Sequence, residues 1–293
     1  MFKTVKPFVK WAGGKSQLLN EIRIKYPKTI EKYCEPFVGG GAVLFDILAN
    51  YSTKEVLIND INPALINTYI QLRDNVDFLI ENLSEIQNDF WKMDNDERKA
   101  FYLEQRESFN NAILCSSFSR EDMAVRFIFL NKTCFNGLYR VNRKGLFNVP
   151  MGSYKKPPIC DEENLRLVSN LLHNVQIKCG DYSKCTDFID EKTFVYIDPP
   201  YRPLNATSSF TSYNENEFGD QQQIELGKFI DEITSKGAKV VASNSDPKNV
   251  DDNDNFFDEL YADYSIKRVS AKRMINSKGI RRGSINELLI CNY

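Results

Sequence analysis

The chain has almost no histidine and no paired cysteines. Its 293 residues include one histidine, His173, so histidine-based metal sites and Ser-His-Asp triads have almost no material. The seven cysteines are scattered and none belongs to a C-x-x-C pair. This spacing argues against zinc ribbons and a disulfide framework, and it is typical of proteins in a reducing cytoplasm. We therefore expect no metal site.

Long apolar runs are also missing. No stretch reaches the roughly 18 consecutive apolar residues of a membrane-spanning helix, and the first residues lack the apolar core of a signal peptide. Hydrophobic residues make up 42% of the chain and charged residues 27%. These proportions predict a soluble globular protein of one large or two modest domains, without a membrane partner.

Acidic residues are absent from two tracts of a chain whose net charge is −2. The tract from Lys132 to Cys160 carries six Lys/Arg, and the tract from Tyr264 to Asn286 carries seven. Segregated positive charge is the expected footprint of a protein that contacts a polyanion. A solvated charged surface is the plainer interpretation, but two acid-free tracts of more than 20 residues make it less favoured.

The most informative stretch is Asp198-Pro199-Pro200-Tyr201. It directly follows Thr193–Ile197, a β-branched and aromatic run that predicts a buried strand, and the prolines end that strand because neither can donate to a sheet ladder. A carboxylate, a rigid backbone and an aromatic ring are thus expected at a strand's C-terminal edge, where ligands bind in open α/β sheets. The plainer alternative is a strand end with a turn.

This group of residues suits methylation of a planar exocyclic amine. The lone pair of adenine N6 or cytosine N4 is delocalised into the ring, so the nitrogen is a poor nucleophile. Acceptors at Asp198 Oδ and the Pro199 carbonyl would bind both N–H groups and favour a pyramidal, more nucleophilic nitrogen. Tyr201 offers a face for stacking a base turned out of a duplex.

A glycine-rich turn indicates where a cofactor binds. Gly39-Gly40-Gly41 follows a predicted strand and precedes a predicted helix at Val43–Leu48, an order that lets backbone approach a cofactor closely. The third glycine of a dinucleotide fingerprint is replaced by Leu44, so S-adenosylmethionine fits better than a dinucleotide. Asp60 ends the next predicted strand, about 20 residues later, where an acid accepts both hydroxyls of a ribose.

A second glycine-containing stretch, Gly14-Lys15-Ser16, resembles the end of a phosphate-binding Walker A loop. The full pattern needs a glycine at the position of Val9, so we reject binding of a nucleoside triphosphate there. Trp11 and Lys15 remain candidate ligand contacts, with a core tryptophan and a surface lysine as the alternative.

The hydrophobic periodicity of the remaining sequence separates a helical region from the predicted sheet. Residues 74 to about 130 show helical periodicity without glycine, and the basic, aromatic stretch from Asn136 to Val149 predicts a β-hairpin that could present arginine to guanine edges. Further helices are expected at 17–26, 62–72, 162–172 and 221–234, further strands at 55–58, 175–179, 238–245, 264–270 and 284–291, and a loop at 207–213.

Several short motifs, in this order, resemble those of Dam-type (D12 class, group alpha) DNA adenine-N6 methyltransferases almost from end to end. They are Lys10-Trp-Ala-Gly-Gly-Lys15, Glu35-Pro-Phe-Val-Gly-Gly-Gly41, Asn59-Asp60, Asn136-Gly-Leu-Tyr-Arg140, Phe147-Asn-Val-Pro150, Gly180-Asp181, Asp198-Pro-Pro-Tyr201, Ser243-Asn-Ser245 and Arg281-Arg-Gly283. The resemblance implies a Rossmann-like, S-adenosylmethionine-dependent α/β methyltransferase sheet with an inserted helical target-recognition domain that carries a β-hairpin. It assigns 1–72 and 162–293 to the catalytic domain and 73–161 to the recognition domain.

The resemblance also implies roles for individual residues. The predicted catalytic residues are Asp198, Pro199, Pro200 and Tyr201. The predicted cofactor contacts are Trp11, Lys15, Phe37, Gly39, Gly41, Asp60, Asp181 and Asp198. The predicted DNA contacts are Lys10, Phe135, Asn136, Leu138, Arg140, Asn142 and Pro150, with Phe135 replacing the tyrosine of some relatives as a ring that can wedge into the base stack.

The implied reaction is transfer of a methyl group from S-adenosylmethionine to an adenine of duplex DNA, in GATC, by base flipping and direct in-line transfer. The implied location is the cytoplasm of a prokaryotic cell, or of a cell carrying a phage that encodes the protein. A cognate restriction endonuclease is a compatible companion, without a stable complex. Two alternatives stay open: a methyltransferase for protein glutamine, an RNA base or cytosine N4, and a DNA-binding regulator with a degenerate methyltransferase core.

Overall fold

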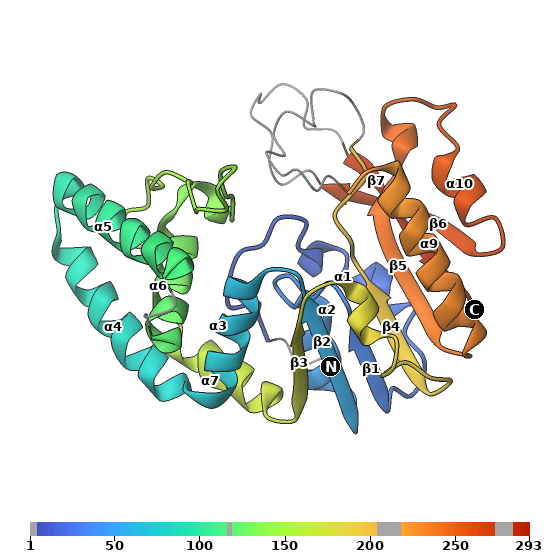
Figure 1. The fold of residues 1–293 in the computed structure, drawn as a ribbon, viewed down its shortest axis with the longest axis horizontal. Coiled ribbons are helices and arrows are strands. Elements are labelled where there is room, and N and C mark those ends of the chain that lie inside the picture. Colours follow the sequence, from blue (N-terminus) through green and yellow to red (C-terminus); the bar gives the residue numbers. More distant parts are fainter. Residues whose placement is uncertain (1–4, 116–118, 204–217, 273–283) are drawn as a thin grey trace. The chain divides into compact units, whose positions relative to one another are not determined.

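The structure is a computed structural model that describes residues 5–115, 119–203, 218–272 and 284–293 (Figure 1). The loop expected at Thr207–Tyr213 lies outside these residues. So do four cations of the second basic tract, Arg273, Lys278, Arg281 and Arg282.

The described strands form one seven-stranded sheet in the order β3-β2-β1-β4-β5-β7-β6. Their bounds are β1 Lys32–Glu35, β2 Glu55–Asp60, β3 Val175–Cys179, β4 Thr193–Ile197, β5 Lys239–Ser245, β6 Ser265–Lys272 and β7 Ser284–Cys291. Strand β1 pairs in parallel with β2 and β4, and β4 pairs in parallel with β5. Strand β7 pairs antiparallel with β5 and β6. The predicted mixed α/β fold is therefore confirmed.

Helices separate many of the strands, a long helical stretch follows β2, and β3 and β4 have only a 3-10 turn between them. Their bounds are α1 Leu19–Arg23, α2 Ala42–Asn50, α3 Pro63–Asp74, α4 Val76–Lys92, α5 Asn95–Leu114, α6 Arg120–Thr133, α7 Glu162–Leu172, α9 Asp220–Ser235 and α10 Phe256–Leu260. Four short 3-10 turns are η1 Lys15–Gln17, η2 Phe135–Gly137, η3 Tyr182–Cys185 and η4 Pro247–Asn249. None of the helices in the described part of the chain is long and apolar enough to span a membrane.

Most predicted elements are confirmed, some to the residue, such as α7 and β7. The helix predicted over residues 17–26 is shorter than expected, because the chain forms η1 first and α1 covers only five residues. Leu18, at the N-cap of α1, has no side-chain oxygen to accept the first N–H groups, so nothing local extends that helix.

The chain divides into two compact units. The first comprises residues 1–14, 39–50 and 60–180, and the second comprises residues 15–38, 51–59 and 181–293. The domain boundaries expected from the sequence, at 72/73 and 161/162, stay a prediction.

In the second unit, the core forms around β4 and the helix α9. All five residues of Thr193–Ile197 are buried, as expected for a parallel strand covered on both faces. Val195 and Ile197 belong to one apolar cluster with Ile230 and Ile233 of α9 and Leu288 of β7. This packing holds the end of β4, and hence Asp198, on a rigid support.

In the first unit, α6 packs against both α4 and α5 (Figure 1). Aromatic rings fill the space between these helices. The ring of Phe129 in α6 meets Phe90 of α4 and Phe101 of α5 edge to face, each at 5.5 Å between centroids. A capping box at the start of α5 satisfies two terminal N–H groups, because Asp94 and Glu97 bond to each other's backbone. This helical support carries the loop that follows α6.

That loop, residues 134–152, is less regular than the β-hairpin predicted for it. Every residue of the loop is described, and its antiparallel pairing is limited to two isolated bridges, Cys134–Met151 and Val141–Phe147. Side chains of α5 replace a partner strand: Asn110 both donates to and accepts from the backbone of Phe147, at 3.0 and 2.8 Å. The hydroxyl of Tyr102 donates to the Val149 carbonyl at 2.8 Å. The loop is therefore held by α5 side chains together with a few backbone bonds of its own, such as that from the Asn148 N–H to the Arg140 carbonyl at 3.1 Å.

Candidate active site

Asp198 lies directly after β4 in the second unit, and its carboxylate is held from two sides. The ammonium of Lys15 lies 2.8 Å from Asp198 Oδ1, and the Lys15 side chain is only 3% exposed. The hydroxyl of Ser243, in β5, donates to the same oxygen at 2.9 Å. Because that proton is committed to Asp198, the hydroxyl of Tyr196 donates to Ser243 Oγ, at 3.1 Å. The acceptor at the end of β4 is thus oriented by a short buried relay.

Tyr201 faces the same ammonium. Its ring lies under Lys15 Nζ, 4.7 Å from the centroid, and its hydroxyl donates to Glu287 Oε2 at 2.5 Å. Burial raises the pKa of Tyr201 well above its usual value, and the nearby carboxylates of Asp198 and Glu287 raise it further. The phenol therefore remains protonated at physiological pH and serves as a donor.

The two prolines between these residues are supported from α9 and β5. Gln223 donates from Nε2 to the Pro200 carbonyl at 3.1 Å, and Asn244 donates to Gln223 Oε1 at 3.0 Å. Gln223 is fully buried and Asn244 nearly so. The backbone of the tetrapeptide is thus fixed, as a site that must orient a planar group requires.

Asp60, the last residue of β2, lies in the first unit against the glycine turn. Its Oδ2 accepts from the Gly39 N–H at 3.0 Å and its Oδ1 from the Asn62 N–H at 2.9 Å. Burial raises the pKa of Asp60, and these backbone donors partly offset that rise. Each carboxylate oxygen keeps a further lone pair that can accept a hydroxyl.

The glycines of this turn are required by close packing. Gly39 and Gly41 have left-handed backbones, with φ of 46° and 75°. A Cβ at Gly39 would lie 2.8 Å from the indole of Trp11, and one at Gly41 would lie 2.5 Å from the Tyr69 hydroxyl. That hydroxyl donates to the Gly39 carbonyl at 3.0 Å. The turn and Asp60 together form a cradle that fits a ribose bearing two hydroxyls.

Trp11 is half-buried and lies among aromatic rings of the first unit. Its indole stacks on Tyr139 at 5.6 Å and 22°, and it also meets Phe127 at 6.4 Å. The indole therefore connects the glycine turn to the loop that follows α6.

Phe37 and Asp181 lie in the second unit, beside aromatic residues that the sequence did not single out. Phe37 contacts the ring of Tyr182 at 5.3 Å and that of Phe218 at 6.0 Å. Asp181 is exposed and accepts from the Ser183 N–H at 2.9 Å. These rings and a carboxylate match the needs of a purine, which requires flat apolar contacts and an acceptor for its amino group.

A buried asparagine organises the candidate DNA contacts at the start of the loop. Asn131, 2% exposed, bonds to both the N–H and the carbonyl of Lys10, each at 2.8 Å, and donates to the Gly137 carbonyl at 3.1 Å. Asn136 is the one described non-glycine residue with a left-handed backbone, at φ 58°. Beside it the ring of Phe135 is 54% exposed, while Leu138 is partly buried.

Further along the loop, Arg140 is exposed and its guanidinium is oriented by Asn148, whose Oδ1 accepts from Nε at 2.8 Å. Asn142 has a local role, because its Oδ1 accepts from the N–H groups of Lys144 and Leu146. Pro150 is exposed, and its carbonyl accepts from the Phe135 N–H at 2.8 Å. The loop thus presents one oriented arginine and one exposed ring.

Comparison with known proteins identifies the family. Residues 11–275 match the D12 class N6 adenine-specific DNA methyltransferases. The chain belongs to this family. It is an adenine-specific DNA methyltransferase, and S-adenosylmethionine is the methyl donor that the family implies.

Three curated relatives align over nearly the whole of this methyltransferase. The type II methyltransferase M.MjaIII of Methanocaldococcus jannaschii is 52% identical, covering 99% of both chains. The type II methyltransferase M1.LlaDCHI of Lactococcus lactis subsp. cremoris is 38% identical, covering 99% of this chain and 96% of the relative. The DNA adenine methylase of Haemophilus influenzae is 35% identical, covering 97% and 92% respectively.

The geometry of this methyltransferase adds residues that the sequence analysis missed as site residues. Glu287 and Gln223 carried no local signal, because each lies in an ordinary strand or helix pattern. Ser243 belongs to the motif Ser243-Asn244-Ser245, which supported the family resemblance but suggested no role for the serine. Asn131 could have been suspected from its position in an otherwise apolar helical run.

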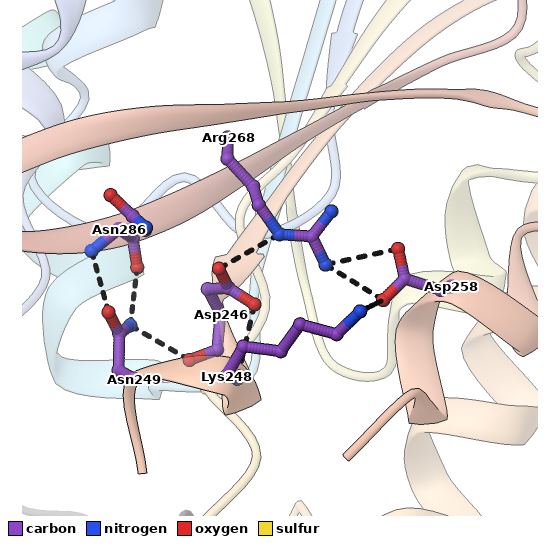
Figure 2. Close-up of polar contacts among 6 residues, drawn as sticks. All are labelled: Asp246, Lys248, Asn249, Asp258, Arg268 and Asn286. Carbon is purple, nitrogen blue, oxygen red and sulfur yellow. Dashed lines mark hydrogen bonds and ion pairs between the residues drawn. The ribbon is translucent and has the colours of Figure 1, made fainter. Parts of the chain in front are cut away.

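Part of the second basic tract is neutralised within the second unit. Lys267 pairs with Glu21 at 2.8 Å. Arg268 pairs with the buried Asp246 at 3.0 Å and with Asp258 at 2.7 Å (Figure 2). For these two residues, intramolecular pairing accounts for the charge, and the hypothesis of polyanion contact is better supported by the tract at 132–160.

Proposed function

We propose that this methyltransferase acts on N6 of an adenine turned out of duplex DNA, and that its target sequence is GATC. One observation carries the proposal. Asp198 and Tyr201 both lie beside the buried ammonium of Lys15, on a support made by β4, β5 and β7. An acceptor and an aromatic face in that arrangement suit a flat base with an exocyclic amine.

In the proposed reaction, the chain orients the amine and takes up its charge. Asp198 Oδ and the Pro199 carbonyl accept the two N–H groups, so the nitrogen becomes pyramidal and its lone pair points away from the ring. S-adenosylmethionine, when bound, supplies a methyl group on a positively charged sulfur. With that group bound, the S–C bond would break as the nitrogen lone pair forms the new N–C bond, and Asp198 Oδ would take up the N–H proton that the amine gives up. Tyr201 stacks on the base throughout, so the rate gain comes largely from orientation.

The proposed cofactor contacts are assigned from the chemistry of each group within its own unit. In the first unit, the cradle of Gly39, Gly41 and Asp60 would take the ribose, with Trp11 against the turn. In the second, Phe37 and Asp181 would take the adenine, and Lys15 would meet the amino-acid end of the cofactor. These assignments follow from the chemistry of the groups present.

The proposed reading of DNA uses the loop after α6. Arg140, held by Asn148, is oriented to contact a guanine edge, and the exposed ring of Phe135 is available to insert beside the flipped base. Lys10, Asn136, Leu138, Asn142 and Pro150 complete the predicted contacts. We further propose that the inserted recognition domain spans 73–161, that the enzyme works in the cytoplasm, and that a restriction endonuclease can accompany it without a stable complex.

Methylation mapping tests the proposal directly. Unmethylated plasmid DNA would be incubated with the protein and S-adenosylmethionine, and modified bases would be located by single-molecule sequencing. We expect N6-methyladenine confined to GATC, and none with an Asp198→Ala variant that retains the wild-type thermal unfolding midpoint. Methyladenine at another motif would refute the GATC assignment, and turnover by Asp198→Ala would refute the role of Asp198.

A further inference from the structure

Glu287 on β7 contacts both Tyr201 and Lys15 and belongs to no motif of the resemblance. Its Oε2 accepts from the Tyr201 hydroxyl at 2.5 Å and lies 3.8 Å from Lys15 Nζ. We propose that Glu287 is a positioning residue that fixes the Tyr201 ring and keeps Lys15 paired when the target amine occupies Asp198. This inference rests on the proposed roles of Asp198 and Tyr201.

Glu287 first restrains the ring of Tyr201. A tyrosine that stacks on a base needs a fixed tilt, and its hydroxyl is the only point at which a hydrogen bond can restrain it. A carboxylate acceptor makes that bond charge-assisted and stronger than a neutral one. The burial that raises the pKa of Tyr201 keeps the proton on the phenol, so the bond persists at physiological pH.

Glu287 also supplies a negative charge beside the Lys15 ammonium. Lys15 is 3% exposed and its nearest carboxylate oxygen, Asp198 Oδ1, is the acceptor proposed for the target amine. Once the amine binds there, the ammonium loses part of its closest pairing in a region with little water. A buried charge without a counter-charge is costly. Glu287, with a side chain only 15% exposed, supplies a second anion within reach of the same ammonium.

The backbone of Asn286, the residue before Glu287, is held by a side-chain clamp from Asn249 (Figure 2). Asn249 donates from Nδ2 to the Asn286 carbonyl at 2.7 Å and accepts at Oδ1 from the Asn286 N–H at 2.8 Å. The same amide donates to the Asp246 carbonyl at 2.8 Å. This pairing imitates a further strand at the point where the β5–β7 ladder begins, and Glu287 is the next residue of β7. The clamp therefore sets where Glu287 enters the site.

Four variants separate the two roles of Glu287. Glu287→Ala removes both the acceptor and the charge, Glu287→Gln keeps an acceptor and removes the charge, and Tyr201→Phe removes the donor. The fourth variant combines Tyr201→Phe with Glu287→Ala. Glu259→Gln, at an exposed carboxylate in α10, is the matched control. Single-turnover methylation rates would be measured on a duplex carrying the mapped site, together with S-adenosylmethionine affinity and the thermal unfolding midpoint.

We expect Glu287→Ala to lower the single-turnover rate about 10- to 100-fold, the range for losing a hydrogen bond to a charged group. Glu287→Gln should recover the part of that loss that belongs to the hydrogen bond, and the remainder measures the missing charge beside Lys15. The combined variant should be slower than Tyr201→Phe only by that remaining factor, since both changes break one hydrogen bond. If Glu287 had only a structural role, Glu287→Ala would lower the unfolding midpoint. Glu287→Gln would then not restore the rate, and the effects of Tyr201→Phe and Glu287→Ala would multiply in the combined variant.

The outcomes distinguish this inference from the function on which it rests. If wild-type and Glu259→Gln proteins methylate DNA and Glu287→Ala does so at the same rate, Glu287 is not a positioning residue and the function stands. If effects of Tyr201→Phe and Glu287→Ala simply multiply, the coupling through the hydroxyl is wrong. If the wild-type protein modifies no DNA while it binds S-adenosylmethionine, the proposed function itself fails.

Discussion

At the scale of single residues, the site is made by buried charges that are each satisfied by a specific partner. Lys15 is paired with Asp198, and Asp60 accepts two backbone N–H groups. Burying a charge is costly unless it is paired and hydrogen-bonded, so these residues would not remain buried for stability alone. Buried acceptors of this kind are what a ligand site needs, and they support the roles proposed for Asp198 and Asp60.

Arg140 gives the first prediction at this scale. Arg140→Ala should relax sequence choice at one position, because a bidentate arginine–guanine pair discriminates by about 1–3 kcal/mol. Methylated sites would be sequenced for the variant and for wild type at equal turnover. Arg143→Ala, a neighbouring exposed arginine of the same loop, is the matched control. An unchanged sequence profile for Arg140→Ala would remove Arg140 from the reading surface.

Asp60 gives a prediction about pH. Burial raises its pKa in the folded protein, so the protonated form is favoured by folding. Its contribution to stability is therefore present below the unfolded pKa and is lost as pH rises through the folded pKa. Binding of S-adenosylmethionine should have the opposite pH dependence, because only the ionised Asp60 carboxylate can accept hydrogen bonds from both ribose hydroxyls.

S-adenosylmethionine affinity should therefore decline on acidification, starting at a higher pH than an ordinary aspartate would cause. Calorimetric titration of the cofactor between about pH 4 and pH 8 measures this. Asp60→Asn should bind more weakly and lose the acidic decline. An identical decline in Asp60→Asn would assign it to another group.

At the scale of elements, side chains rather than backbone ladders fix the two functional edges. Asn110 of α5 clamps the loop after α6, and Asn249 clamps the start of β7. An amide can do this because it carries a donor and an acceptor in one plane, as a peptide group does. Each clamp holds the backbone of a residue next to one that contacts the proposed site: Phe147 precedes Asn148, and Asn286 precedes Glu287.

Arg268 gives the prediction at this scale, because it joins β6 to the end of β5 and to α10 (Figure 2). Arg268→Ala leaves the carboxylate of Asp246, 1% exposed, without its cation. Breaking a fully buried pair costs about 3–5 kcal/mol. Since the Arg268 side chain is 32% exposed, we expect a loss of about 2 kcal/mol in the free energy of unfolding after allowing for solvent screening.

Chemical denaturation measures this loss. Lys267→Ala is the control, because its pair with Glu21 is roughly 40% exposed on both sides and should be worth less than about 0.5 kcal/mol. Equal effects of the two variants would mean that the burial of Asp246 has no energetic consequence.

At the scale of the whole molecule, net charge and local charge have opposite signs. The chain carries −2 overall, yet the tract from Lys132 to Cys160 has six cations and no acid. Lys132 is partly buried, and desolvation lowers its pKa, to which the nearby charges of Lys10 and Lys6 add. We therefore expect association with DNA to depend on the exposed cations of this tract and not on the average charge.

Affinity for duplex DNA should fall steeply with salt, because phosphate contacts release counterions. Lys144→Ala, at the exposed tip of the loop, should reduce the slope of log affinity against log salt by about 1 if it contacts a phosphate. Fluorescence anisotropy over a range of salt concentrations measures the slope. Lys54→Ala, in an exposed pair with Glu31, should leave it unchanged. A salt response that is flat for wild type would exclude the tract as a DNA contact.

The amino-acid sequence by itself determined the elements and the residues that end them. The breaker-free run before Asp198 predicted β4, and the acid after the second strand predicted the place of Asp60, because strand propensity and prolines act locally. The short motifs also identified the family, since their order along the chain is a property of sequence alone.

Only the tertiary structure decided which distant residues meet. Glu287 lies 86 positions after Tyr201, and nothing local indicates that its carboxylate accepts the phenol. The loop after α6 was predicted as a hairpin, because its turn signals are local, whereas the α5 side chains that replace a partner strand are not. Contacts of this kind depend on how β7 pairs with β5 and how α5 packs on α6, and a linear pattern of propensities carries no information about either.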